Sequence, residues 1–230
     1  VRLARVVQPY MPAGRSVEVP HFGVDTEQFH PPAEPPPPRQ RPDGLFVGNL
    51  SRAKGVDVLL EALAARPGAW GGFAFVGDGP DEAALRRRAD ALGLADRLDW
   101  LGRVPTGRVP ELMRQADFLV LPSRSEGRPN VVLEALASGL PVIATRVGGT
   151  GELLGEGPST QLGTRQRGLL VPPGDPAALA AAIDRLACDV DLRARLGQVG
   201  RQYVIAHDLT WQRTARQFEA IFQRACTPGD

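Results

Sequence analysis

Two glutamates at a fixed spacing are the first candidates for chemistry in this sequence. Glu126 and Glu134 stand eight residues apart in "SRSEGRPNVVLEA", the first in an expected loop and the second in an expected helix. A carboxylate just past a strand end can reach a bound polyol, and one a turn into the helix can accept two adjacent hydroxyls. The alternative is an acid favoured by the helix dipole plus an ordinary surface glutamate. For these two residues alone, the alternative is favoured.

A second candidate is the loop "GNLSRAKG" at residues 48–55. Gly48 and Gly55 let the backbone approach a ligand, Arg52 and Lys54 add positive charge, and the helix that follows offers unpaired N–H groups. The combination predicts an anion site, although the spacing is not that of a Walker loop. A solvated basic turn is the alternative.

Lys54 is also the only lysine in the chain, where arginine supplies the rest of the 27 Lys and Arg residues. Coding bias toward arginine is one explanation for a single leftover lysine. The other is that the site requires a compact ammonium on a flexible stem, which a planar guanidinium does not copy. Taken alone, the lysine favours the first explanation.

Short apolar runs alternate with amphipathic segments along most of the chain, and they must position these loops. Strands are expected at 45–48, 98–102, 117–123, 141–145 and 168–173, and a strand followed by a turn is expected at 73–79. Helices are expected at 56–65, 81–94, 108–116, 130–139, 175–187, 189–204 and 210–225. This alternation implies right-handed β-α-β crossovers. We therefore predict an α/β, Rossmann-like parallel sheet of about six strands with helices on both faces, and ligands outside the carboxyl ends of its strands.

Proline content marks the domain organisation. Residues 31–38, "PPAEPPPP", hold six prolines in eight positions and read as a stiff extended connector. We assign residues 1–38 to an N-terminal segment and Pro-rich linker. Residues 39–205 form the predicted Rossmann-like domain, and 206–230 a C-terminal helical segment.

Composition and residue spacing narrow the classes of function. A net charge of +1 gives no bulk attraction to nucleic acid or to an anionic membrane, so anion binding must be local. Two cysteines, Cys188 and Cys226, do not make a disulfide framework, which favours a cytoplasmic setting. No apolar run approaches a membrane span. His21, His30 and His207 are scattered without metal-ligand spacing, so no metal and no cofactor are expected.

Taken together, the loops resemble the C-terminal, donor-binding half of GT-B glycosyltransferases of the large retaining family 4 (glycosyltransferases group 1). The phrases that carry the resemblance run in order: "VPHFGVDTEQFHP", "FVGNLSRAKGVDVLLEAL", "FVGDGP", "LDWLGRVP", "ADFLVLPSRSEGRPNVVLEALASGLPVIATRVGG" and "GLLVPPGDPAALAAAI". Any one phrase is weak, but six in order are specific. The Glu126–Glu134 pair looks like the family's E-x7-E motif.

The resemblance implies a role for each loop. Lys54 would meet the donor diphosphate, Glu134 the ribose hydroxyls and Glu126 the donor sugar. Amides of residues 127–131 would face the sugar and phosphates, and residues 102–104 the base. Glu126 and Lys54 would be the catalytic residues, and the implied nucleotide-sugar site comprises Gly48, Asn49, Arg52, Lys54, Arg103, Val104, Glu126, Gly127, Arg128, Asn130, Val131 and Glu134.

The chain departs from the family pattern in two of these loops. Asn49 stands where the family usually has an arginine, so one pyrophosphate charge is missing unless Arg52 or Arg128 supplies it. Pro129 removes a backbone donor, and Asn130 adds a side-chain amide. These departures suggest a different donor or a different sugar pose.

The resemblance implies hexosyl transfer from a nucleotide-diphosphate sugar, UDP- or GDP-linked, to an acceptor hydroxyl with retention. The acceptor would be a glycan, a lipid-linked or a small molecule held by an N-terminal domain that this chain does not contain. We therefore expect a donor half that is inactive alone, in the cytoplasm or at the inner face of the membrane. The alternatives are a non-catalytic nucleotide-sugar binding module and a GT-B sugar-nucleotide epimerase.

Overall fold

The computed structural model describes residues 23–34, 37, 39–155 and 166–226. Its sheet has six parallel strands in the order β3-β2-β1-β4-β5-β6. The strands are β1 (Gly44–Val47), β2 (Phe73–Val76), β3 (Leu98–Gly102), β4 (Phe118–Leu121), β5 (Val142–Thr145) and β6 (Leu169–Val171). The predicted parallel α/β fold is confirmed.

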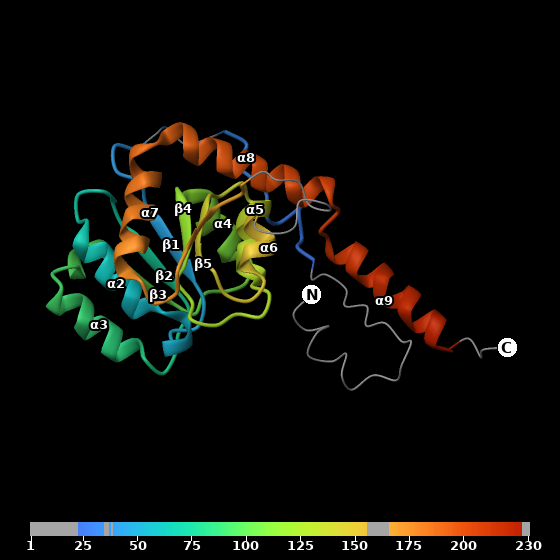
Figure 1. The fold of residues 1–230 in the computed structure, drawn as a ribbon, viewed down its shortest axis with the longest axis horizontal. Helices are drawn as coiled ribbons and strands as arrows, with labels where there is room; N and C mark the ends of the chain where they lie inside the picture. The colour runs from blue at the N-terminus through green and yellow to red at the C-terminus, as the bar shows by residue number, and fades with distance from the viewer. Residues whose placement is uncertain (1–22, 35–36, 38, 156–165, 227–230) are drawn as a thin grey trace.

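Helices cover both faces of this sheet (Figure 1). One layer holds α2 (Val56–Ala65), α3 (Glu82–Ala91) and α7 (Pro176–Cys188). The other holds α4 (Arg108–Gln115), α5 (Asn130–Ala137) and α6 (Thr150–Leu154). The helix α8 (Val190–Ala206) packs on both α7 and α5, and two short 3₁₀ turns occur at η2 (Arg52–Lys54) and η3 (Ala95–Arg97).

Strand β4 shows why the sheet strands read as continuous apolar runs. Phe118 and Val120 point into the core beneath α2 and α7, whereas Leu119 and Leu121 point into the core beneath α5. All four side chains are at most 1% exposed. A parallel sheet covered on both faces must bury every residue of a central strand, so the usual alternation of polar and apolar residues is absent.

The strand order reverses between β1 and β4, which are neighbours in the sheet. From β1 the chain leaves through α2 on one face, and from β4 it leaves through α5 on the other. The helices that follow the two loops therefore lie on opposite faces of the sheet, and the carboxyl edge at this topological switch point is the usual ligand position in such sheets. Both sequence candidates, Lys54 and Glu126, follow these two strands.

Two segments far apart in sequence meet at one end of the domain. Val24 forms a parallel bridge with Thr210, and its N–H donates to the Leu209 carbonyl at 3.0 Å. Arg201 of α8 donates to the carbonyls of Phe29 and Ala137. Residues 23–34 are thereby fastened to the core. The expectations for 1–22 and for positions 35, 36 and 38 lie outside the described residues.

The last helix, α9 (Trp211–Cys226), projects away from the body of the domain (Figure 1). Trp211, Phe218 and Phe222 are exposed by 45%, 43% and 63%, although they are large apolar side chains. Across the described ranges, no helix has both the length and the apolarity needed to cross a bilayer.

Candidate functional site

An ion pair joins the loops that follow β1 and β4. Lys54 Nζ donates to Glu126 Oε1 at 2.6 Å, and Ser123 Oγ donates to the same oxygen at 2.7 Å. The Glu126 side chain is 8% exposed and that of Lys54 is 27% exposed. Two donors hold Oε1, whereas Oε2 has no donor in the described part of the chain. The pair thus presents a fixed carboxylate oxygen and an ammonium with further N–H donors.

Glu134 supplies a second carboxylate near this edge, from the second turn of α5. Its side chain is half-buried and has no hydrogen-bond or ion-pair partner among the residues described. Burial raises the pKa of Glu134 because the charged form loses hydration. A carboxylate that lacks its own donors is well suited to accept hydroxyl hydrogens from a ligand.

The N-terminus of α5 is open toward ligands. Pro129 occupies the N-cap with extended backbone, and no side chain caps this helix. The N–H groups of Asn130 and Val131 have no acceptor within the described residues. These amides and the helix dipole together favour an anion or a polar oxygen at this end.

Two glycines let the loops approach as closely as they do. Gly55 has φ +66°, and a Cβ there would lie 2.1 Å from the Pro122 carbonyl oxygen. Gly148, with φ +54°, would place a Cβ 1.9 Å from the Glu126 carbonyl oxygen. The neighbouring Gly149 N–H donates to the Gly127 carbonyl at 2.7 Å. The loop after β4 is therefore held between the loops after β1 and β5.

Arg128, which was predicted as a possible source of charge for the diphosphate, lies against the loop after β5. Its side chain packs over Gly149 and faces Glu152 and Tyr203. Burial lowers the pKa of its guanidinium, and no ion pair to it forms within the described residues. Whether Arg128 supplies a charge to a diphosphate stays a prediction.

Four other predicted residues make no hydrogen bond or ion pair with Lys54 or Glu126 in the described part of the chain: Gly48, Asn49, Arg103 and Val104. Gly48 N–H continues the β1–β2 ladder by donating to the Val76 carbonyl, and Asn49 is exposed. Val104 packs against the core on the α4 side. Arg103, 81% exposed, donates to Asp78 at 3.1 Å.

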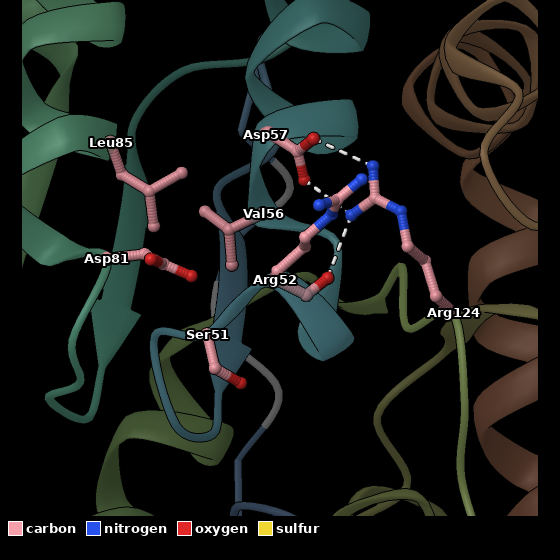
Figure 2. A pocket seen from close by; sticks show the side chains of 7 residues that line it. All are labelled: Ser51, Arg52, Val56, Asp57, Asp81, Leu85 and Arg124. Carbon is pink, nitrogen blue, oxygen red and sulfur yellow. Dashed lines mark hydrogen bonds and ion pairs between the residues drawn. The ribbon is translucent and has the colours of Figure 1, made fainter.

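Arg52 lines a shallow pocket of about 300 Å³ between the N-terminal ends of α2 and α3. Figure 2 shows its side chain beside Asp57 and Arg124, which are joined by two parallel hydrogen bonds. Sequence reasoning missed Asp57, Arg124 and Ser123. The only signal for them was position, since each follows a strand end or opens a helix.

No group of three His, Cys, Asp or Glu side chains within the described ranges is arranged to hold a metal ion. The polar groups near the switch point include a Lys–Glu pair, a half-buried glutamate and helix amides without an acceptor among the described residues. This set suits an anionic ligand that also carries neighbouring hydroxyls.

A six-stranded parallel sheet with helices on both faces and this set at its switch point defines a Rossmann-like ligand-binding domain. Residues 31–203 match the family model "Glycosyl transferases group 1", and the chain belongs to that family. It is 33% identical over 180 residues to an uncharacterised glycosyltransferase of Methanocaldococcus jannaschii. The aligned region covers 78% of this chain and 47% of that protein.

Solved structures share this fold. Sucrose-phosphate synthase from Thermosynechococcus elongatus has a TM-score of 0.80 at 28% identity and matches 96% of this chain and 55% of its own. Anabaena HepE in complex with UDP has a TM-score of 0.77 at 22% identity, over 95% of this chain and 60% of its own. The domain is one half of a GT-B architecture, and the chain spans about half the length of the curated relatives it matches.

Proposed function

We propose that this domain binds the nucleotide-diphosphate sugar donor of a retaining hexosyltransferase. The observation that carries the proposal is the Lys54–Glu126 pair beside the uncapped N-terminus of α5. Membership of the family supports sugar transfer. HepE, a structural neighbour, has been crystallised with UDP and with UDP-glucose, which supports a nucleotide-sugar as ligand.

In this proposal Lys54 and the free amides of α5 stabilise the departing diphosphate. The bond from the anomeric carbon to the diphosphate oxygen breaks while a bond to the acceptor oxygen forms, through an oxocarbenium-like transition state. Negative charge then grows on the leaving group, and fixed cations and N–H dipoles stabilise developing charge most effectively. Glu126 Oε2 orients the sugar, and Glu134 accepts the ribose hydroxyls.

Calorimetric titration of this chain with UDP, GDP and pyrophosphate tests the proposal. Lys54→Ala should weaken nucleoside diphosphate binding by about 1.5–3 kcal/mol, the range for hydrogen bonds to charged groups. Lys54→Arg should restore only part of the loss, because a planar fork does not fit the place of an ammonium. If wild type binds none of the three ligands, the proposal is wrong.

The contact with Glu126 requires a further variant. Lys54→Ala leaves a nearly buried carboxylate without its cation, and this cost could resemble the loss of a ligand contact. Adding Glu126→Gln removes that charge. If the double variant still binds diphosphate weakly, the affinity is lost because Lys54 is absent. If it binds with wild-type affinity, the loss in Lys54→Ala is due to the uncompensated charge of Glu126.

Glu134→Gln tests the ribose contact separately. It should weaken UDP and GDP but leave pyrophosphate binding nearly unchanged, because pyrophosphate has no hydroxyls to place on the carboxylate. A solvated, uninvolved glutamate predicts changes within about 0.5 kcal/mol for all three ligands. Equal weakening of all three would place Glu134 on the phosphates instead.

Transfer itself requires the whole protein. We expect this chain alone to bind nucleoside diphosphate without appreciable turnover, since the acceptor site of a GT-B enzyme lies across from the donor half. A donor panel assayed with the whole protein separates the alternatives. Released nucleotide with a new glycoside supports the transferase, an inverted donor sugar supports an epimerase, and binding alone supports a non-catalytic module.

A further inference from the structure

A second ion pair lies beside the Lys54–Glu126 pair and has the more specific geometry. Arg124 Nη1 donates to Asp57 Oδ1 and Nη2 to Asp57 Oδ2, both at 2.7 Å (Figure 2). Asp57 lies in the first turn of α2, and Arg124 lies in the loop after β4. Two parallel bonds between planar groups fix orientation as well as distance. The pair therefore sets the angle between the start of α2 and the β4 loop.

Arg124 also forms hydrogen bonds with the turn that carries Lys54. Its Nη1 donates to the Arg52 carbonyl at 2.8 Å, and its backbone N–H donates to the Ala53 carbonyl at 2.8 Å. These carbonyls belong to the two residues before Lys54, and Asp57 comes three residues after it. One residue thus holds the Lys54 turn on both sides, and Glu126 follows that residue by two positions.

We propose that Arg124 is a positioning residue, anchored by Asp57, that sets Lys54 against Glu126 for binding the donor diphosphate. The inference rests on the proposed function of the same site. Both side chains of the anchor pair are about one-third exposed, 33% for Arg124 and 37% for Asp57. Exposed pairs add little to folding stability, so the pair is better suited to fixing geometry than to holding the fold.

The hydrogen bonds from Arg124 lower the pKa of Asp57, which keeps this carboxylate charged at neutral pH. Within the described residues, the other hydrogen-bond partners of the two side chains are backbone groups of the same turn and helix start, and Glu61 adds a coulombic interaction with Arg124. Arg124→Met therefore removes the hydrogen bonds of the guanidinium to Asp57 and to the Arg52 carbonyl. It keeps the backbone bond to Ala53, so the loop stays bonded to the segment that follows β1.

The affinity test compares diphosphate with monophosphate. Arg124→Met and Asp57→Asn should each weaken UDP (or GDP, whichever wild type prefers) about tenfold, equivalent to about 1.4 kcal/mol, and leave UMP or GMP within twofold. Arg124→Lys should fall between, because one ammonium cannot make both parallel bonds. Parallel loss of mono- and diphosphate together with a lower melting temperature would overturn the positioning role.

Asp184→Asn is the matched control. It breaks the pair between Arg66, the C-cap residue of α2, and Asp184 of α7, which has an N–O distance of 2.7 Å and side chains that are 59% and 31% exposed. This variant should change neither affinity. If it lowers the diphosphate affinity as much as Asp57→Asn does, any damage to α2 suffices and the specific role of Arg124 is wrong.

A second readout needs no ligand, since Lys54 is the only lysine in the chain. Lysine labelled with ¹⁵N at Nζ gives one NMR signal. In Glu126→Gln the ion pair is broken, so the signal of that variant gives the reference position for an unpaired Lys54. In Arg124→Met the signal should move toward that reference, and a signal at the wild-type position would overturn the proposal. Absence of nucleotide binding by wild type contradicts only the proposed function, because this readout still decides the positioning role.

Discussion

The loop after β4 and the loop after β3 lie at the same edge of one sheet but are held very differently. The β4 loop is bonded to Ala53 on one side and to Gly149 on the other. Among the described residues, the β3 loop makes one side-chain hydrogen bond to a neighbouring loop, in the exposed Arg103–Asp78 pair. Strand β4 has neighbours on both sides, β1 and β5, whereas β3 is an edge strand. Position in the sheet therefore decides how firmly a loop can be held.

This difference has a functional meaning under the proposed assignment. The diphosphate and sugar would meet groups that are already in place, so little ordering is lost on binding. The base would meet a loop that can adapt. Under the proposed function, the chemistry would take place at the firmly held centre, and the base would lie at the more loosely held edge.

The largest test of the comparison replaces with alanine the glycine that abuts the β4 loop, Gly148, and the glycine from which the β3 loop starts, Gly102. Gly148→Ala would place a Cβ 1.9 Å from the Glu126 carbonyl, whereas the open space around Gly102 contains no atom within 4 Å of a Cβ. Both residues have positive φ, +54° and +62°. We expect Gly148→Ala to lower the free energy of unfolding by about 3 kcal/mol or more, and Gly102→Ala by about 1 kcal/mol, the backbone strain alone. Urea unfolding measures both, and equal losses would show that the β4 loop is not tightly held.

A smaller effect concerns pH and the half-buried Glu134. Its pKa is raised by burial, so its charged form weakens the folded state above that pKa, and stability increases as pH falls through it. Glu134→Gln removes this cost. The variant should be more stable than wild type at pH 7, and the difference should vanish below the pKa of an unfolded glutamate. Urea unfolding from pH 3 to 8 measures this, and a difference that does not change with pH would contradict it.

The sequence predicted the elements better than the contacts between them. The helix at 56–65 and the strand at 98–102 have the predicted bounds, because apolar periodicity reports local structure directly. The rule that ligands follow strand ends also selected Lys54 and Glu126. Their direct pairing was not predicted, since it depends on β1 lying next to β4, and periodicity does not give strand order. Asp57 and Arg124 are 67 residues apart in sequence and were missed for the same reason.

The smallest effect is expected at the β3 loop. Arg103→Ala should leave the free energy of unfolding within about 0.5 kcal/mol of wild type, because the pair with Asp78 is solvent-exposed. If the loop meets the base, UDP and GDP affinity should change unequally, each by about 0.5–1 kcal/mol, as for an exposed cation on an aromatic ring. Calorimetry with both nucleotides checks this. A loss as large as that of Lys54→Ala would mean that the edge loop is as important as the rigid centre.

The interlocked backbone around Glu126 has a consequence for protein engineering. Residues 122–129 fit against Gly55 on one side and Gly148 on the other, with no space for a Cβ at either place. A loop taken alone from a homologous enzyme would lack the turn and the glycines that it contacts in its own protein. The effects of substitutions at contacting positions are not additive. Under the proposed function, a change of donor preference accordingly requires that three segments be moved together: 48–57, 122–131 and 146–149.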